Sequence, residues 1–224
     1  MIPTNQNILV VDDHPINTDA YINLIASNRE IQEIYFHKAI DCESASKIIN
    51  QLEKRTIPLN AALIDISIPP FHKEKLLSGT DIALLIRNSF PDCIIIMLTM
   101  HTEPLLLFNV HKQVKPEGFL SKNDIDFETF PEIFKSIVNA ENFYSPSINN
   151  SIQKLLRQTI KWDEYDTQII LCLEKGILTK NLSQYINLSL SAIEKRKATM
   201  KNQILDRKAT DNELIEKCKL LKLI

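Results

Sequence analysis

Two patterns of hydrophobic residues alternate along the first 142 residues of the chain. One is a short apolar run rich in β-branched residues, which is typical of a strand buried on both faces of a parallel sheet. The other repeats apolar residues every three or four positions, as an amphipathic helix does. The strand-like runs cover 8–11, 34–37, 61–66, 93–98 and 118–120, and the helix-like stretches cover 16–27, 42–54, 81–88, 103–112 and 126–142.

Five β–α repeats with short connections predict an α/β domain in which helices cover both faces of a five-stranded parallel sheet. A chain of this length favours the flavodoxin-like strand order 2-1-3-4-5. The three glycines, Gly79, Gly118 and Gly176, do not form a phosphate-binding glycine-rich loop, so nucleotide binding is not expected.

The pattern changes after this first domain, which we place at 1–142. The segment "FYSPSINNSIQ" sets Pro146 among serine and asparagine residues and predicts a linker over 143–159. From 160 to 224 every apolar pattern is helical, which predicts a second, all-α domain of four helices.

Local signals mark where these four helices begin and end. Gly176 is a plausible cap at the end of the first, and a short second helix covers 179–186. The third begins near Ser189, whose hydroxyl can cap it, and the fourth begins at a capping box of Thr210 and Glu213. A short helix, a tight turn and a third helix are typical of a helix-turn-helix.

The composition is ordinary for a globular protein, with 44% hydrophobic and 24% charged residues. No apolar run approaches the roughly 20 residues that span a bilayer, and the amino terminus lacks the features of a secretion signal. We therefore expect a cytoplasmic protein without a membrane partner. Four cysteines lie within apolar patterns and are expected to be small core residues: Cys42, Cys93, Cys172 and Cys218.

Charge divides the chain more sharply than composition does. Residues 1–150 carry a net charge of −7 and residues 151–224 a net charge of +5. An acidic first part joined to a basic last part predicts two domains with different partners, with nucleic acid as the candidate for the second.

Polar residues follow the predicted strands at their carboxyl ends. Asp12 and Asp13 follow the first strand, Asp65 and Thr99 end the third and fourth, and Lys122 follows the fifth. Ligands of open α/β sheets bind at this edge. A solvated turn with Asp13 capping the next helix would explain the acid pair alone. The convergence of three carboxylates, a hydroxyl and an ammonium instead indicates a site for a hard divalent cation such as Mg²⁺.

These groups suit phosphoryl transfer. A carboxylate can act as the nucleophile and form an aspartyl phosphate, and Asp65 is the most central of the three in the sheet. The metal and Lys122 would neutralise charge on the phosphoryl group, while Thr99 could donate to one of its oxygens.

The segments "LVVDDHP", "ALIDISIP", "IIIMLTM" and "GFLSKND" resemble, in order, the signature segments of the receiver domain of two-component response regulators. The resemblance implies that Asp12, Asp13 and Asp65 hold Mg²⁺ and that a histidine kinase phosphorylates Asp65. It also implies that Thr99 and Lys122 sense the phosphoryl group. Phe119 falls at the position of the family's rotating aromatic switch, although aromatic residues mostly fill cores.

Two departures from the receiver pattern stand out. Met100 follows Thr99 where receivers generally have a small residue, and we hypothesise that its bulk restricts access or slows hydrolysis. The loop 69–80 is longer than usual, and its His72, Lys73 and Lys75 are candidates for gating the site or recognising a partner. The alternative for this loop is an ordinary solvated surface.

The segment "LEKGILTKNLSQYINLSLSAIEKRKATMKNQIL" resembles the LuxR/NarL-type output domain, a four-helix DNA-binding module. The resemblance implies that some residues lie near base edges in the major groove and others near phosphates. The residues near bases are Glu194, Lys195 and Ala198, and those near phosphates are Lys180, Ser191, Lys197 and Lys201.

The polar signature of this module is altered. Ala192 replaces the usual threonine, Arg196 replaces a histidine, and Glu194 stands where a DNA-contacting lysine is common. An acid is repelled by phosphate, but Glu194 could accept a hydrogen bond from cytosine N4 or form a capping box with Ser191. Taken alone, the basic run "EKRK" is typical of a solvated helix face.

The sequence is therefore interpreted as a response regulator whose phosphorylation leads a homodimer to bind two DNA half-sites. One alternative is a receiver whose helical domain docks on a protein instead of DNA. An aspartyl-phosphate phosphatase of the haloacid dehalogenase type is disfavoured, because that chemistry needs an acid where Ser67 stands, and no enzyme is predicted.

Overall fold

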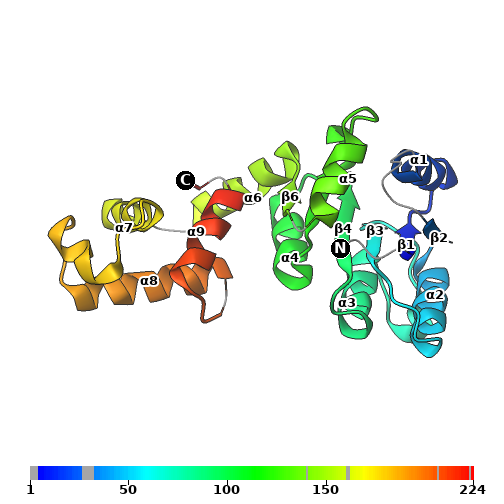
Figure 1. The fold of residues 1–224 in the computed structure, drawn as a ribbon, viewed down its shortest axis with the longest axis horizontal. Helices are drawn as coiled ribbons and strands as arrows, with labels where there is room; N and C mark the ends of the chain where they lie inside the picture. The colour runs from blue at the N-terminus through cyan, green and yellow to red at the C-terminus, as the bar shows by residue number, and fades with distance from the viewer. Residues whose placement is uncertain (1–4, 27–32, 140, 160–161, 206, 222) are drawn as a thin grey trace. The chain divides into compact units, whose positions relative to one another are not determined.

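The chain folds into two compact units, Met1–Ile148 and Asn149–Ile224, in a computed structural model (Figure 1). The structure describes residues 5–26, 33–139, 141–159, 162–205, 207–221 and 223–224. Among these residues, no helix combines the length and the apolar character that a membrane crossing requires.

A parallel sheet forms the centre of the first unit. Its strand order is β2-β1-β3-β4-β5-β6, so the predicted order of the first five strands is confirmed. The sixth strand corrects the prediction of five, because it pairs with β5 inside the segment assigned to a linker. Two residues are too few to produce a recognisable strand pattern. The strands are β1 Asn5–Val11, β2 Glu33–Ala39, β3 Ala61–Asp65, β4 Ile94–Thr99, β5 Gly118–Ser121 and β6 Phe143–Tyr144.

Among the described residues, five α-helices cover the sheet, as predicted. Helices α1 and α5 contact each other on one face, and α2, α3 and α4 form a contacting row on the other (Figure 1). Helix α5 is shorter than the helix predicted at 126–142. The helices are α1 Pro15–Ala26, α2 Cys42–Lys54, α3 Gly79–Ser89, α4 Pro104–Val114 and α5 Phe130–Val138.

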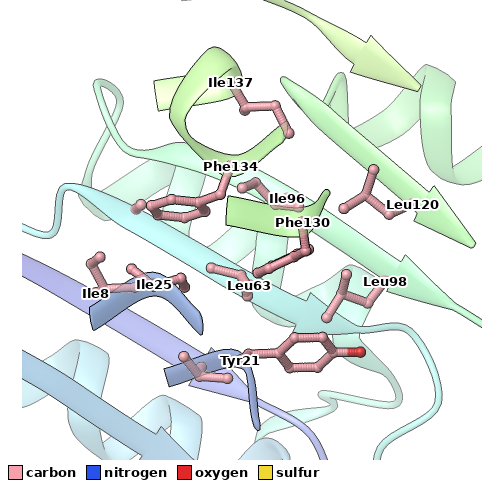
Figure 2. Close-up of a cluster of buried hydrophobic side chains, with 12 residues drawn as sticks. Ile8, Tyr21, Ile25, Leu63, Ile96, Leu98, Leu120, Phe130, Phe134 and Ile137 are labelled. Atoms are coloured by element: carbon pink, nitrogen blue, oxygen red, sulfur yellow. The ribbon is translucent and has the colours of Figure 1, made fainter. Parts of the chain in front are cut away.

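The core between α1, α5 and the sheet is built from aliphatic strand residues and aromatic helix residues (Figure 2). Tyr21 of α1 lies 5.4 Å from Phe130 of α5, measured between ring centroids. Phe130, Phe134 and Ile137 of α5 are almost completely buried. This packing holds the sheet between its helices and leaves the carboxyl ends of the strands free to carry polar groups.

The second unit is helical, as predicted, and the segment predicted to be a linker contains regular secondary structure. Residues 143–159 contain β6 and a 14-residue helix, α6 Pro146–Thr159. Pro146 is the first residue of this helix, where proline is favoured because its missing N–H is not needed. The remaining helices are α7 Glu164–Glu174, α8 Leu190–Leu205 and α9 Asp211–Leu220, with a 3₁₀ helix, η3 Thr179–Gln184, between α7 and α8.

The predicted helix boundaries of the second unit are largely found. Gly176 has a φ of 78° just after α7, and the Thr210–Glu213 capping box opens α9. The Ser189 hydroxyl accepts a hydrogen bond from the Ala192 N–H at 3.3 Å, so Ser189 rather than Ser191 caps α8. The predicted helix at 179–186 is the 3₁₀ helix η3 instead of an α-helix.

Candidate functional site

An ammonium group joins two carboxylates at the carboxyl edge of the sheet. Lys122 Nζ lies 2.7 Å from Asp12 Oδ2 and 2.6 Å from Asp65 Oδ2. Asp12 follows β1, Asp65 ends β3, and Lys122 opens the short 3₁₀ helix η2 Lys122–Asp124 directly after β5. The structure thus brings together three of the residues predicted from strand ends. It leaves two carboxylates facing one lysine, an excess of negative charge that a further cation would balance.

Asp12 is held in place by its local backbone. It is fully buried, and its Oδ1 accepts a hydrogen bond from the His14 N–H at 2.9 Å. The neighbouring Asp13 is partly exposed, and its Oδ1 lies 2.7 Å from His14 Nδ1. Atoms of Asp12, Asp13 and His14 that can bind a metal all lie within 4.8 Å of one another. The carboxylate oxygens of this set, with Asp65 nearby, are the ligands that Mg²⁺ prefers.

Burial changes the protonation equilibria at this edge. Burial raises the pKa of Asp65, although hydrogen bonds from Lys122 and from the Ser67 N–H act in the opposite direction. Burial also acts to lower the pKa of Lys122, but its hydrogen bonds to Asp12 and Asp65 outweigh this effect and raise it. Lys122 therefore remains a cation, and added positive charge at the site would favour the ionised, nucleophilic form of Asp65.

A cavity of about 520 Å³ opens beside these groups. Asp65, Lys122 and Asp13 face it, and Met100 and Phe127, both largely exposed, contribute apolar surface. Asp65 is thus accessible to a small substrate although the residue is only 5% exposed. The full lining is Asp13, His14, Asn17, Ala20, Tyr21, Asp65, Ser67, Met100, Lys122, Ile125 and Phe127.

Thr99 and Phe119 occupy more enclosed positions. Thr99 is fully buried at the end of β4, and its Oγ1 accepts a hydrogen bond from the His101 N–H at 2.9 Å. Phe119 is also fully buried and meets the Tyr144 ring of β6 edge-on, with centroids 6.0 Å apart. In this structure Phe119 is a core residue, the alternative raised by its aromatic character.

Three side chains to which the sequence assigned no role form a hydrogen-bonded series at the same edge of the sheet. Ser67 Oγ lies 2.8 Å from His101 Nε2, and His101 Nδ1 lies 3.1 Å from Glu103 Oε2. The signal in the sequence was spacing: Ser67 stands two residues after Asp65, and His101 stands two residues after Thr99. Because parallel strands end at one edge, the segments after β3 and β4 lie side by side.

Gly79 is a second site feature that the sequence analysis left unexplained. A Cβ atom on Gly79 would lie 1.9 Å from the backbone oxygen of Asp65. The Gly79 N–H donates to the Ile66 carbonyl at 3.0 Å. Only glycine allows α3 to begin this close to the end of β3, so Gly79 helps to position Asp65.

The loop 69–80 is anchored away from the cavity. It contains a 3₁₀ helix, η1 His72–Glu74, and Glu74 Oε2 accepts a hydrogen bond from Ser46 Oγ of α2 at 2.7 Å. Its candidate residues His72, Lys73 and Lys75 are exposed and are not found among the described residues that line the cavity. Their role in gating or recognition remains a prediction.

The predicted DNA contacts of the second unit separate into two groups. Lys197 is buried, and its Nζ lies 2.7 Å from Asp211 Oδ2 of α9 and 2.5 Å from Thr179 Oγ1. Lys201 Nζ lies 2.7 Å from the other oxygen of Asp211. The charge of Lys197 thus takes part in the packing of α8 on α9, and its contact with phosphates stays a prediction. The exposed candidates are Lys180, Ser191, Glu194, Lys195 and Ala198.

Two further charged residues of α8 have partners within the unit. Glu194 Oε2 lies 3.5 Å from Lys197 Nζ, so Glu194 offsets part of that charge instead of forming a capping box. Arg196 Nη1 lies 2.9 Å from carboxylate oxygens of both Asp163 and Asp166. Its guanidinium also lies over the Tyr165 ring, 5.5 Å from the centroid. Arg196 thus joins α8 to the start of α7.

Comparisons with known proteins agree with this two-unit architecture. A scan against models of protein families finds no match. The chain is 23% identical over 203 residues to the transcriptional regulatory protein RcsB of Salmonella typhi, covering 88% of both chains. It is also 23% identical over 203 residues to the oxygen regulatory protein NreC of Staphylococcus epidermidis, covering 85% of this chain and 87% of that protein.

Solved structures show the same fold. A structure of RcsB from Salmonella enterica serovar Typhimurium, bound to a promoter in the presence of phosphomimetic BeF₃⁻, has a TM-score of 0.56 at 19% identity. The match covers 97% of this chain and 99% of that one. The isolated receiver domain of the same protein matches 66% of this chain with a TM-score of 0.52 at 22% identity. The chain therefore shares the fold of these RcsB structures over almost its whole length, and it is similar in sequence to the regulatory proteins RcsB and NreC.

Proposed function

We propose that this chain is a DNA-binding transcription factor that is switched by phosphorylation of Asp65. The observation that carries the proposal is the bridge from Lys122 to Asp12 and Asp65 beside an open cavity. A buried carboxylate next to a fixed ammonium can accept a phosphoryl group, because the new negative charge meets a cation already in place.

The donor in this proposal is the phosphohistidine of a cognate histidine kinase. A carboxylate oxygen of Asp65 forms the new bond to phosphorus while the bond from phosphorus to the histidine nitrogen breaks. Asp12, Asp13 and Asp65 would hold Mg²⁺, which supplies positive charge for the phosphoryl oxygens. Lys122 pairs with the phosphorylated side chain, and the Thr99 hydroxyl turns from its contact with the His101 N–H toward the phosphoryl group.

The output in this proposal is a homodimer that binds two half-sites of double-stranded DNA. The solved structures of RcsB include one of two dimers bound to DNA, and the chain shares that fold. Lys195, Glu194 and Ala198 lie on the exposed face of α8 and would meet base edges in the major groove. Lys180 and Ser191 would contact phosphates. The proposal places the protein in the cytoplasm, where its DNA target lies.

Phosphorylation is tested by incubating the full-length chain with a small-molecule phosphodonor and Mg²⁺ and measuring intact mass. We expect one phosphoryl group on the wild type and none on Asp65→Asn. Asp92→Asn is the matched control, because Asp92 is an exposed carboxylate in the same unit. An unmodified wild type, or a phosphoryl group retained by Asp65→Asn, would overturn the proposal.

A second candidate is a helical unit that docks on a protein instead of DNA. It is favoured by the internal ion pairs of Lys197 and Lys201, which leave α8 with less free positive charge than its sequence suggests. Specific DNA binding releases counterions, so its affinity falls steeply with salt. The protein-docking function would be favoured if the affinity for every duplex tested were low and did not change with the salt concentration.

A further inference from the structure

A serine, a histidine and a carboxylate form a hydrogen-bonded chain beside the phosphorylation site. Ser67 Oγ is 2.8 Å from His101 Nε2, and His101 Nδ1 is 3.1 Å from Glu103 Oε2. This hydrogen-bonded series starts at Ser67, two residues after Asp65, and ends at Glu103, directly before α4. None of these three side chains takes part in accepting the phosphoryl group in the function proposed above.

The partners determine which nitrogen of His101 carries the proton. An ionised carboxylate only accepts hydrogen bonds, so Glu103 requires a proton on Nδ1. Nε2 of the neutral ring is then an acceptor, and the Ser67 hydroxyl donates to it. This is the arrangement in which a histidine draws a proton from a hydroxyl group while a carboxylate stabilises the resulting imidazolium.

The hydrogen-bonded side chains lead from the cavity to the solvent. Ser67 lines the cavity together with Asp65 and Lys122, whereas His101 and Glu103 are partly exposed to solvent and are not found among the described residues that line the cavity. The Ser67 N–H donates to Asp65 Oδ1 at 3.1 Å, and the His101 N–H donates to Thr99 Oγ1 at 2.9 Å. The backbones on both sides are therefore fixed to residues of the phosphorylation site, which aligns the hydroxyl with the space around Asp65.

We propose that Ser67, His101 and Glu103 form a proton relay that accelerates hydrolysis of the aspartyl phosphate and so sets the lifetime of the active state. The proposal rests on phosphorylation of Asp65. A water molecule in the cavity attacks phosphorus, and the bond between phosphorus and the Asp65 oxygen breaks with its electron pair returning to the carboxylate. The water gives a proton to Ser67 Oγ, whose own proton passes to His101 Nε2. The products are inorganic phosphate, the free carboxylate of Asp65 and an imidazolium on His101, which then returns its proton to the solvent.

The three residues have different parts in this step. Ser67 touches the attacking water and is the catalytic residue. His101 acts through Ser67, and Glu103 acts through His101 by holding the ring in one tautomer, so both are positioning residues. General acid–base groups of this kind contribute roughly 10²- to 10⁴-fold to a reaction, and a relay acting through a hydroxyl is expected to lie at the low end.

The lifetime of the phosphorylated full-length chain tests the relay. After loading with a small-molecule phosphodonor and removal of the excess, the loss of the acyl phosphate is followed by intact mass. We expect His101→Ala and Ser67→Ala each to lengthen the lifetime by at least about tenfold, and Glu103→Gln to lengthen it less. Glu53→Gln is the control, because Glu53 is an exposed carboxylate of α2 that is not found among the described cavity-lining residues.

Chemical rescue separates a relay from a structural effect. His101 is 36% exposed, so free imidazole can reach the space left by His101→Ala and restore rapid hydrolysis. The double variant Ser67→Ala/His101→Ala and the wild type should not respond to imidazole. Lifetimes that are unchanged or shorter in the single variants, or an absence of rescue, would overturn the relay alone. A wild type that forms no acyl phosphate would overturn both the relay and the proposed function.

Discussion

Two lysines with little exposed side chain have similar acidic surroundings in the two units and serve different ends. Lys122 lies between Asp12 and Asp65 with 10% of its side chain exposed. Lys197 lies beside Asp211 and Thr179 with 5% of its side chain exposed. Lys122 faces a cavity of about 520 Å³, whereas Lys197 fills the contact between α8, η3 and α9. A buried cation among acids therefore marks a chemical site only where a substrate can approach it.

The largest effect on stability is expected from Lys197→Met. Removing one partner of a buried ion pair typically costs about 3–5 kcal/mol, because the remaining charge loses its compensation. Asp211 keeps Lys201 and Thr179 as partners, so we expect a loss of about 3 kcal/mol, at the low end of that range. Denaturant unfolding of the second unit measures it. An unchanged unfolding free energy would contradict the structural role of Lys197.

The other half of the comparison is Lys122→Met. Without the ammonium, Asp12 and Asp65 are left as two buried acids, and the phosphoryl group loses a fixed cation. We expect the rate of phosphorylation by a small-molecule donor to fall by about 100-fold. Lys47→Met is the control, because Lys47 is an exposed lysine of α2 paired with Glu43. Equal rates for both variants would show that Lys122, like Lys197, is structural.

Lys195→Met sharpens the contrast within α8. Lys195 is exposed, only two residues from buried Lys197, so its replacement should leave the unfolding free energy unchanged. If Lys195 contacts a base, the binding free energy for the preferred sequence should weaken by about 1–3 kcal/mol. If it contacts a phosphate, the slope of the logarithm of the binding constant against the logarithm of the salt concentration should fall in magnitude by about 1. Titration of labelled duplexes at several salt concentrations distinguishes these results. No change in either quantity would remove Lys195 from the DNA interface.

The smallest effect is expected at the cap of α9. Hydrogen bonds from the Thr210 N–H and from Arg207 hold the pKa of Glu213 at about 2, below its ordinary value of 4.5. A depressed carboxyl pKa stabilises the fold above pH 4.5, and the contribution is lost as the pH falls toward 2. Glu213→Gln should therefore lower the Tm slightly near neutral pH and have no effect at about pH 2. A Tm difference that persists unchanged in acid would contradict this origin.

The site at the carboxyl edge of the sheet could be predicted because the strand ends constrain the positions of its residues. An apolar run of β-branched residues predicts both a buried strand and the position of the residue that follows it. Asp12, Asp65 and Lys122 therefore meet as expected once the strand order is known. Ser67 and His101 were not linked in advance, since their contact depends on the path of the loops rather than on the sheet.

The second unit was harder to predict, because the presence of a charged residue in a helix does not reveal whether its side chain faces the interior or the solvent. Lys197 follows Ile193 by four residues and precedes Met200 by three, so it lies on the buried face of α8. That spacing was visible in the sequence, but a lysine is rarely fully buried without a partner. Its partner, Asp211, belongs to the next helix, and only packing brings the two together.

The secondary structure of residues 143–159 was hard to predict for a different reason. Proline among serine and asparagine residues is typical of a loop, yet proline is also favoured at the first position of a helix. Pro146 takes the second role in α6. The strand β6 just before it is held by pairing with β5 and by burial of Tyr144, neither of which two residues of sequence can indicate.

Selection of duplex DNA from a random pool by the full-length chain tests the central claim most directly. It is run with and without a phosphoryl mimic and Mg²⁺, with Asp65→Asn carried in parallel. The account predicts enrichment of a two-fold symmetric motif by the wild type only in the presence of the mimic. Failure to enrich any motif in either state, even at low salt, would contradict DNA recognition, and equal enrichment in both states would contradict its control by Asp65.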